Sequence, residues 1–387
     1  MNNYYINIHT SSRLVGKNMR RTGKMRRKKQ KKIIIVSALS LLLLLTVGYA
    51  AFSTNLSITA KGNIKEKSRV IQAWSATDQT DFHSVFYKQN IVSVAFLDNN
   101  RVPSNATESW NVSEDKENGG VMAWVVPSSN DTSKYDLYIG AKGGVIANED
   151  SSYLFYNFQN VESINFNNNF DTSNATSMLG MFMFCTGIET IDISSFDTSN
   201  VIYMGNMFNM YNSTTSSVIE NKLTNIIFGD NFTTKNVTSI SQMFVGCENL
   251  THLDIENWDT SNITIMNSVF AHCHNLESLD LSKWDTSNVT EMGWMFLYCT
   301  NLVSLNISNF NTSNVTNMYQ MFRECRNLES LNLCSFNTSN VTDMRNIFQN
   351  TYVIKQIKVG PNWTTANAKT ENMFQYSGVS SVTTGQC

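Results

Sequence analysis

Residues that commonly catalyse reactions or bind metals are sparse in this sequence. The histidines are His9, His83, His252, His272 and His274. No HExxH, CxxC, GxSxG or phosphate-loop motif occurs, so the sequence predicts no enzyme and no cofactor. One run, from His272 to His274, has metal-ligand residue types. We expect its central Cys273 to face the interior and the two histidines to diverge to the surface, which predicts no metal site.

Aspartates recur at one position, at the start of a turn with the sequence Asp-Thr-Ser-Asn. They are Asp171, Asp197, Asp259 and Asp285. Stacked carboxylates could hold Ca²⁺, but Thr233, Asn311 and Asn337 interrupt the column. Asp, Ser, Thr and Asn side chains bond nearby backbone groups and therefore favour turns. A turn role is our leading interpretation, and a Ca²⁺ site is the alternative.

These turns belong to a repeat that runs from residue 170 almost to the C-terminus. The copies begin at Phe170, Phe196, Phe232, Trp258, Trp284, Phe310, Phe336 and Trp363. Their spacing is 26 residues except for one step of 36, which contains an inserted stretch at 212–222, and a last step of 27. A repeat of this length is typical of a solenoid, in which each unit buries its apolar side against its neighbours.

Two periodicities within a unit predict its local structure. In the copy that starts at Trp258, the apolar residues at helical spacing are Ile263, Met266, Phe270 and Cys273. Leu279 and Leu281 alternate with polar residues, as on a strand with one buried face. Methionines recur at fixed positions of the unit, where core packing explains them. We therefore expect an α/β leucine-rich-repeat solenoid of short parallel strands and short helical segments.

Asparagine recurs just before each predicted helical segment. Examples are Asn262, Asn288, Asn314 and Asn340. This side chain is expected either to cap the helix or to point inward and satisfy the loop backbone of the next coil. Both roles are structural, and neither involves a ligand.

Cysteine also recurs at one position of the predicted helical side. Examples are Cys247, Cys273, Cys299 and Cys325. The position suits a small buried apolar residue, so free buried thiols are our leading interpretation, and bridges between adjacent coils are the alternative. Cys334 and Cys387 lie outside this column and are candidates for exposed reactive thiols.

The N-terminal residues differ in charge from the rest of the chain. Residues 1–32 contain 11 Lys or Arg and no Asp or Glu, and the apolar residues 33–52 carry no charge. This order is typical of a signal peptide or signal anchor, with the basic segment cytoplasmic, so we expect membrane contact through 33–52 and no nucleic-acid binding. We expect a linker at 53–82, a small β-rich N-terminal cap at 83–143 and the repeats at 144–387.

The repeat resembles that of BspA-like leucine-rich-repeat surface proteins, the DUF285 repeat family. The resemblance rests on FDTSN at 196–200, CENLTHLDI at 247–255 and SNVTEMGWMF at 287–296. Residues 103–126 and 135–166 resemble the segment that precedes the repeats in such proteins. The resemblance implies an exported bacterial cell-surface protein, and some family members are implicated in adhesion to host components. It implies no catalytic residue.

Outward positions of a solenoid form an extended surface that can recognise partners. On the predicted helical side, the aromatic residues expected there are Trp294, Tyr298, Tyr319, Phe184 and Tyr203. Exposed aromatics in a row suggest contact with a protein or a glycan, and loose packing against the cap or the insert is the alternative. We expect a cell-surface protein that binds a host or matrix protein, a glycan or another cell. The alternative function is a structural spacer or surface coat with no single ligand.

Overall fold

The structure is a computed structural model that describes residues 57–58, 64–65, 67–385 and 387. The predicted basic segment 1–32 and the predicted membrane segment 33–52 lie outside the described residues. The described part of the chain contains no helix with the length and hydrophobicity of a membrane span. All described residues belong to a single compact unit.

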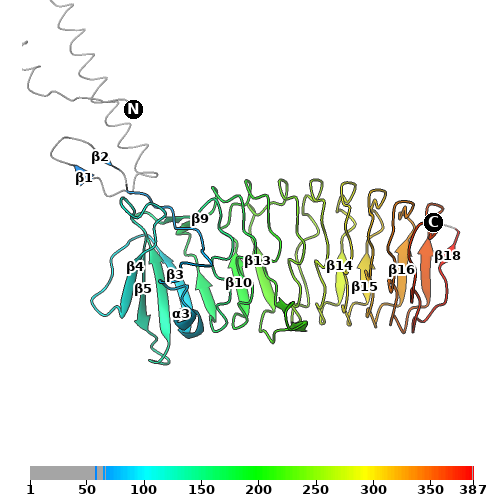
Figure 1. Ribbon diagram of the computed structural model, residues 1–387, viewed down its shortest axis with the longest axis horizontal. Helices are drawn as coiled ribbons and strands as arrows, with labels where there is room; N and C mark the ends of the chain where they lie inside the picture. The colour runs from blue at the N-terminus through cyan, green and yellow to red at the C-terminus, as the bar shows by residue number, and fades with distance from the viewer. Residues whose placement is uncertain (1–56, 59–63, 66, 386) are drawn as a thin grey trace, which may run out of the picture. The chain divides into compact units, whose positions relative to one another are not determined.

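The N-terminal part of this unit is a five-stranded mixed sheet with the order β4-β5-β6-β3-β8 (Figure 1). Its strands are β3 (Ile91–Leu97), β4 (Glu108–Asn111), β5 (Met122–Pro127), β6 (Tyr135–Gly140) and β8 (Ser163–Asn165). Strand β3 is parallel to β6 and β8, whereas β5 is antiparallel to β4 and β6. Val94 and Phe96 of β3 point to the same face and are buried. Strand β8 lies just before the first aromatic start, so the sheet leads directly into the repeats.

Short elements accompany this sheet. Helix α3 (Val85–Asn90) begins at Ser84, whose hydroxyl oxygen accepts a hydrogen bond from the Tyr87 N–H at 3.3 Å. Strands β1 (Ser57–Ile58) and β2 (Ile64–Lys65) form an antiparallel pair. Among the described residues α3 is the single α-helix, and it lies outside the repeats.

Residues 67–82, which we expected to belong to a linker, instead pack onto the sheet and the first coil. Ile71 and Phe82 are buried. At the end of this segment, His83 Nε2 lies 3.0 Å from the carbonyl oxygen of Leu154. The linker prediction is wrong for this part because a few irregularly spaced apolar residues complete the core, and such spacing has no periodic signal.

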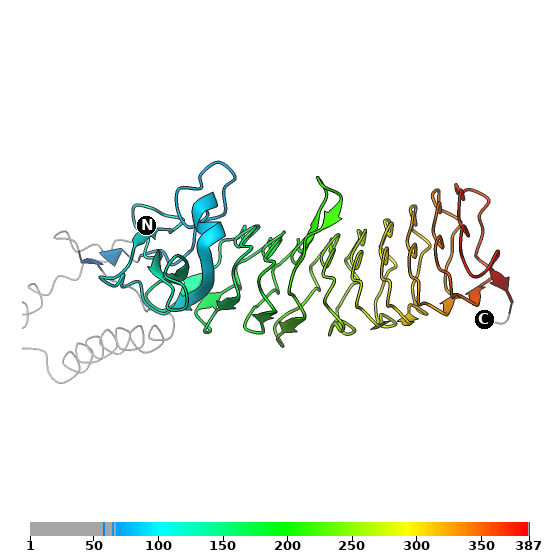
Figure 2. The same cartoon turned by 90° about the horizontal axis from the view of Figure 1, so that it is seen from below.

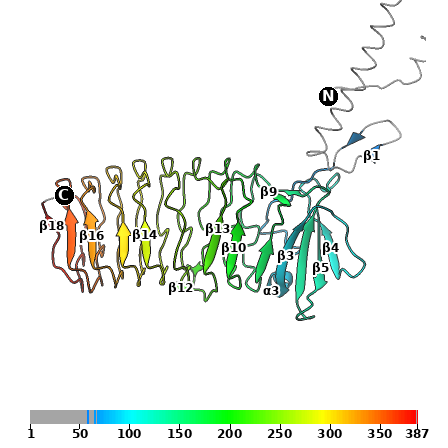
Figure 3. The same cartoon turned by 180° about the vertical axis from the view of Figure 1, so that it is seen from behind.

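After the sheet, the chain winds into stacked coils (Figures 1 and 3). Their parallel strands are β10 (Thr190–Ile193), β13 (Asn225–Phe228), β14 (Ser278–Asp280), β15 (Ser304–Asn306), β16 (Ser330–Leu333), β17 (Gln356–Val359) and β18 (Thr383–Thr384). Strands β7 (Val145–Ile146) and β9 (Phe170–Asp171) form another parallel pair. Leu279 pairs with Leu305 at the repeat spacing, and Leu331 pairs with Ile357 in the same way. The prediction of parallel strands stacked at the repeat spacing is confirmed.

The segments predicted to be helical are ribbons of tight turns, which we call the turn ribbon of each coil. The Leu297 N–H donates to the Trp294 carbonyl oxygen at 3.0 Å, whereas the Trp294 N–H donates to the Tyr319 carbonyl oxygen of the next coil at 2.8 Å. Trp294 and Tyr298 have φ of 60° and 59°, which interrupts a right-handed helix. Every second N–H group of the ribbon therefore donates to the next coil. It is then not available for the i→i−4 hydrogen bonds of an α-helix. The helical part of the α/β prediction is wrong.

The side-chain spacing predicted for these segments is nevertheless observed. In one ribbon Ile263, Met266, Phe270 and Cys273 are buried, and so are Val269 and Ala271 between them. A ribbon of successive i→i+3 turns buries positions three and four apart, as a helix does. Periodicity therefore located the buried face correctly and misidentified the backbone that presents it.

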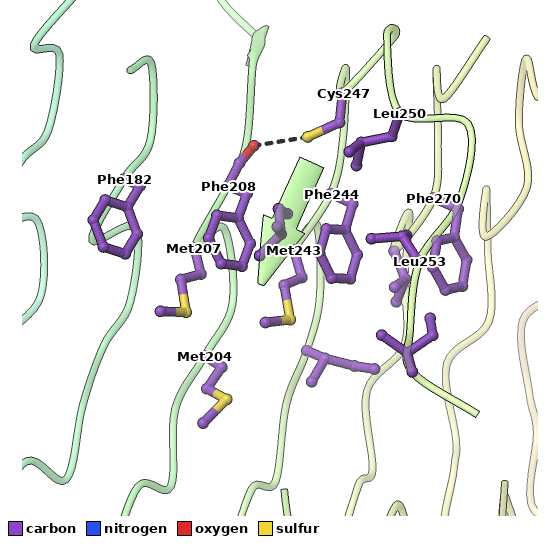
Figure 4. Packing of buried hydrophobic residues seen from close by; sticks show 14 of the residues in the cluster. Phe182, Met204, Met207, Phe208, Met243, Phe244, Cys247, Leu250, Leu253 and Phe270 are labelled. Atoms are coloured by element: carbon purple, nitrogen blue, oxygen red, sulfur yellow. Dashed lines mark hydrogen bonds between the residues drawn. The ribbon is translucent and has the colours of Figure 1, made fainter. Parts of the chain in front are cut away.

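Buried rings stack along the interior of the coils (Figure 4). The phenylalanine column consists of Phe155, Phe182, Phe208, Phe244, Phe270, Phe296, Phe322, Phe348 and Phe374, and successive ring centroids lie 5.5–5.9 Å apart. Met204 and Met243 are buried beside it, as predicted. Each coil thus buries its apolar side against its two neighbours.

The inserted residues form a hairpin that projects from the stack (Figure 2). Strand β11 (Tyr211–Asn212) pairs antiparallel with β12 (Ser217–Val218). The Ile219 N–H donates to the Met210 carbonyl oxygen at 2.8 Å and closes the hairpin at its base. The insert therefore leaves the stacking of the coils unbroken.

Candidate interaction surface

Two of the predicted surface aromatics, Trp294 and Tyr319, contact each other on adjacent coils. Their ring centroids are 5.1 Å apart and their planes meet at 79°. The guanidinium carbon of Arg345, from the following coil, lies 5.0 Å from the Tyr319 centroid. Arg345 Nη2 also donates to Asp343 Oδ2 at 2.6 Å, which holds the guanidinium in place. We call Trp294, Tyr319 and Arg345 the Trp294 strip.

Tyr298 belongs to a second row, formed by Tyr211, His272, Tyr298 and Arg323, which we call the His272 strip. His272 lies between Tyr211 and Tyr298, with centroid distances of 4.9 and 4.8 Å and interplanar angles of 24° and 18°. The guanidinium carbon of Arg323, from the next coil, lies 6.0 Å from the Tyr298 centroid. Burial, together with the nearby His274, lowers the pKa of His272 to about 4. The imidazole is therefore neutral at pH 7 and stacks as an uncharged ring.

A glycine allows Tyr211 to reach His272 across the intervening coil. Gly246 occupies the repeat position that His272 and Tyr298 occupy in their own coils, and its φ is 76°. A Cβ at Gly246 would lie 2.9 Å from the carbonyl carbon of Met210 and 3.0 Å from the backbone nitrogen of Tyr211. Gly246 has no side chain, so Tyr211 of the hairpin occupies the space that a side chain at this position would fill.

The other predicted surface aromatics lie elsewhere. Phe184 is 8% exposed, and its ring centroid lies 5.7 Å from that of Tyr156. Its prediction as a surface residue is wrong because the side chain packs back over the first coil. Tyr203 is 52% exposed, and among the described residues no ring contacts it. The structure therefore brings together Trp294 and Tyr319, with Tyr298 on the same turn ribbon as Trp294.

The histidines that flank Cys273 also differ from the prediction. Their ring centroids lie 5.8 Å apart, so the two side chains do not diverge. His274 Nδ1 lies 3.5 Å from Glu248 Oε2. Among the described residues, no group of three or more His, Cys, Asp or Glu is placed to hold a metal ion. The pair instead packs beside Tyr298.

The recurring aspartate has the turn role predicted for it. Asp259 Oδ1 accepts a hydrogen bond from the Ser261 N–H at 3.1 Å. The equivalent bonds of Asp171, Asp197 and Asp285 are 2.9–3.0 Å long. Asn311 Oδ1 accepts from the Ser313 N–H at 3.1 Å, so an amide replaces the carboxylate without loss of the turn. The turn interpretation is confirmed.

The recurring asparagine joins coils and caps no helix. Asn288 Nδ2 donates to the Ser261 carbonyl oxygen of the preceding coil at 2.7 Å. Asn262, Asn314 and Asn340 make equivalent bonds of 2.7 Å, and all four residues are exposed. The capping interpretation is wrong because no helix follows the turn. The alternative was right that the amide satisfies backbone of a neighbouring coil and wrong that the side chain points inward.

The threonine of the same turn is a structural residue that our sequence reasoning missed. Thr286 Oγ1 donates to the Asn311 carbonyl oxygen at 3.0 Å and accepts from the Asn311 N–H at 2.8 Å. The other buried members of this column are Thr172, Thr198, Thr234, Thr260, Thr312 and Thr338. A signal was present, since threonine holds this position in each copy while its neighbours vary.

The recurring cysteines are free and buried, as predicted. The thiols of Cys247, Cys273, Cys299 and Cys325 each donate to a phenylalanine carbonyl oxygen of the preceding coil, at 3.0–3.2 Å. Figure 4 shows this bond between Cys247 and Phe208. Burial raises the pKa of every thiol in the column, to about 12 for Cys185. The thiols therefore stay protonated and unreactive near neutral pH.

Cys334 and Cys387 are not the exposed reactive thiols that we predicted. They form a disulfide with their Cα atoms 5.6 Å apart. The two cysteines are 53 residues apart in the sequence. Strand β18 pairs with β17, and the chain after β18 brings Cys387 back to Cys334 at the end of β16. The pairing depends on how the tail folds, which no local pattern encodes.

Comparison with known proteins places the repeats in a family. Residues 149–227, 210–304 and 276–383 match the family described as "Mycoplasma protein of unknown function, DUF285". These matches together cover more than half of the sequence. The chain belongs to the DUF285 family, whose repeats are BspA-like.

Two further comparisons add little to this DUF285 assignment. A crystal structure of a leucine rich cell surface protein from Faecalibacterium prausnitzii A2-165 is similar over 80% of this chain and 93% of that chain, with 11% identity and a TM-score of 0.24. A TM-score of this size does not establish a common fold. No curated protein matches the sequence.

The strips are particular to certain repeats of this DUF285 chain. The positions equivalent to His272 and Tyr298 hold Met210, Gly246 and Glu324 in other copies. Our sequence reasoning identified Tyr298 and missed its partners Tyr211, His272 and Arg323, which come from the insert and from other coils. Only their stacking identifies them as one surface.

Proposed function

We propose that this DUF285 chain is an exported bacterial cell-surface protein that binds a partner protein, such as a host or matrix protein, through its two strips. The observation that carries the proposal is the gathering of Trp, Tyr and Arg side chains from adjacent coils on one side of the stack. These residue types contribute most of the binding energy in protein interfaces. A row that crosses several coils also matches the extended surface by which repeat proteins recognise partners.

The geometry favours a protein over a glycan. Sugars stack on open ring faces, but His272 is covered on both sides by Tyr211 and Tyr298. Tyr319 is covered by Trp294 and by the Arg345 guanidinium. The strip residues are partly buried, so each offers a partner only part of its ring or guanidinium group. These groups suit the mixed apolar and hydrogen-bonding surface of a polypeptide.

Two observations support export and retention at the surface. The Cys334–Cys387 disulfide is typical of proteins outside the reducing cytosol. The basic residues 1–32 followed by the apolar residues 33–52 have the order of an export signal or an uncleaved anchor. We propose that the repeats are displayed outside the membrane and that residues 33–52, where they are retained, hold them there.

The test displays the full chain on bacterial cells and measures saturable binding to arrays of extracellular matrix proteins and of glycans. Tyr298→Ala and Trp294→Ala are expected to weaken binding to a protein target about 30-fold each, as for interface residues worth roughly 2 kcal/mol. Tyr203→Ala is the matched control, because Tyr203 is exposed and has no ring partner among the described residues. It is expected to leave binding unchanged.

Three outcomes would contradict the proposal. Binding to glycans alone would assign the surface to another ligand class. Equal losses from Tyr203→Ala and Tyr298→Ala would remove the strips from the interface. Absence of saturable binding across both arrays would favour the alternative of a structural spacer or surface coat. Unchanged thermal unfolding of each variant excludes misfolding as the cause of a loss.

A further inference from the structure

The last coil displays a row of backbone donors that have no acceptor among the described residues. In the preceding coil, the Phe348 N–H donates to the Met373 carbonyl oxygen at 3.1 Å, and the Asn350 N–H donates to the Gln375 carbonyl oxygen at 3.0 Å. The corresponding N–H groups of the last coil belong to Thr370, Asn372, Phe374 and Tyr376. The row therefore repeats the pattern of N–H donors by which each preceding coil bonds to the coil after it. We call it the C-terminal edge.

A cavity lined by both apolar and polar side chains lies at the C-terminal edge. The phenylalanine column ends at Phe374, which is half-buried and stacks on Phe348 at 5.5 Å. A cavity of about 690 Å³ opens beside it, lined by Trp363, Met373 and Val382 among others. Inside the stack, the equivalent space is filled by the Phe and Met side chains of the next coil. The edge thus combines a row of hydrogen-bond donors with an uncovered apolar surface.

The tail of the chain lines the cavity with Val382 but runs along the strand side and leaves the turn ribbon of the last coil uncovered by described residues. Strand β18 pairs with β17, and Cys387 is bonded to Cys334, which directly follows β16. The described tail therefore returns along the strand side toward earlier coils. It does not supply carbonyl groups to the turn ribbon of the last coil.

A second copy of the chain does not complement the C-terminal edge. Two such edges facing each other would place N–H donors against N–H donors. The opposite end of the stack is covered, since Trp74 packs 5.2 Å from Tyr153 and Phe82 packs 6.3 Å from Phe158. Head-to-tail stacking of two copies is therefore blocked by the sheet and by residues 67–82. An occupant of the C-terminal edge must therefore bring carbonyl acceptors for the N–H row.

We propose that the C-terminal edge binds an extended segment of another protein, which adds to the stack as one more turn ribbon. Carbonyl groups of alternate residues accept from the N–H row, and an apolar side chain of the segment covers Phe374. This site is separate from the two strips and does not depend on them. Its partner is defined by an accessible extended backbone and one bulky apolar residue at the position of the next phenylalanine.

The probe is a synthetic peptide with the sequence of residues 314–324. Within the stack, the carbonyl oxygens of Tyr319, Met321 and Arg323 in this segment accept from the preceding coil at 2.8–2.9 Å, and Phe322 continues the phenylalanine column. The full chain is incubated with this peptide, and amide hydrogen exchange is followed by mass spectrometry. Exchange across 370–376 is expected to slow at least about tenfold, while exchange across the strips stays unchanged.

Two controls keep the test decisive. A peptide in which the residue corresponding to Phe322 is Asp should give no protection, because it cannot cover Phe374. The protein variant Phe374→Asp should also lose the protection, while its exchange upstream of 336 and its disulfide remain as in the parent. Protection that is independent of both changes, or no protection at millimolar peptide, would overturn the proposal. Formation of a dimer through this edge, detected by sedimentation equilibrium, would overturn it in favour of self-association.

Discussion

The two ends of the coil stack are finished in different ways. At the N-terminal end, a five-stranded sheet and residues 67–82 cover the first coil, and Phe96 packs 4.5 Å from Phe170. At the C-terminal end, the phenylalanine column stops at the half-buried Phe374, and the tail is held by the Cys334–Cys387 disulfide. An apolar column needs cover at its ends, because a repeat buries its surface only against a neighbour. At the N-terminal end the chain itself supplies this cover. At the C-terminal end the described residues form a disulfide and leave the last turn ribbon without a neighbouring coil.

The largest expected effect is a difference in unfolding free energy between matched Phe→Ala substitutions at the two ends, because the two rings differ in burial. Phe96→Ala removes a fully buried ring that also lies 5.3 Å from Phe166, so it should lower the free energy of unfolding by about 3–5 kcal/mol. Phe374→Ala, the matched change at the other end, should cost less than about 2 kcal/mol because the ring is half-buried. Urea unfolding of both variants measures the difference. Equal costs would show that the C-terminal edge is covered in solution.

A smaller effect is expected from the covalent link. Replacing both Cys334 and Cys387 with Ser should lower the free energy of unfolding by roughly 2–4 kcal/mol, since the link restricts the unfolded chain. Because coils contact only their neighbours, faster hydrogen exchange should be confined to about the last two coils, near residues 336–384. Reductant should have no further effect on the double variant, since the remaining cysteines are already free thiols with no disulfide to reduce. Faster exchange as far as the N-terminal sheet would contradict this local role.

The smallest expected effect on stability comes from replacing the recurring threonine in two different coils. Thr338 is buried, and its Oγ1 donates to the Thr364 carbonyl oxygen at 2.7 Å and accepts from the Thr364 N–H at 2.7 Å. Thr338→Val should therefore cost about 1–3 kcal/mol by leaving backbone groups unsatisfied. Thr365 holds the same position in the exposed last coil, so Thr365→Val should stay within about 0.5 kcal/mol. Thermal unfolding compares the two variants, and a similar cost at both sites would show that the Oγ1 hydrogen bonds between coils are not the cause.

The repeat, the inward residues and the stacking of coils could all be predicted from the sequence. Leu279 and Leu281 alternate as a strand with one buried face requires, and both are buried. The free cysteines and the turn role of aspartate also followed from repeat position and residue chemistry. These features are local or repeat identically, so one copy predicts the others. The same reasoning wrongly predicted a helix for the turn ribbon, because ribbons of turns and helices both bury residues three and four positions apart.

What only the tertiary structure decided depends on contacts between distant segments. Trp294 reaches Tyr319 on the next coil, Tyr211 reaches His272 across Gly246, and Cys387 returns to Cys334. Whether an outward side chain is exposed, stacked or buried is set by its neighbours on adjacent coils, which is why Phe184 proved buried and Tyr203 isolated. The sequence determined which side of each coil is apolar, because hydrophobic burial depends on residue type and period. The stack determined the surface, because that surface is composed of side chains from different coils.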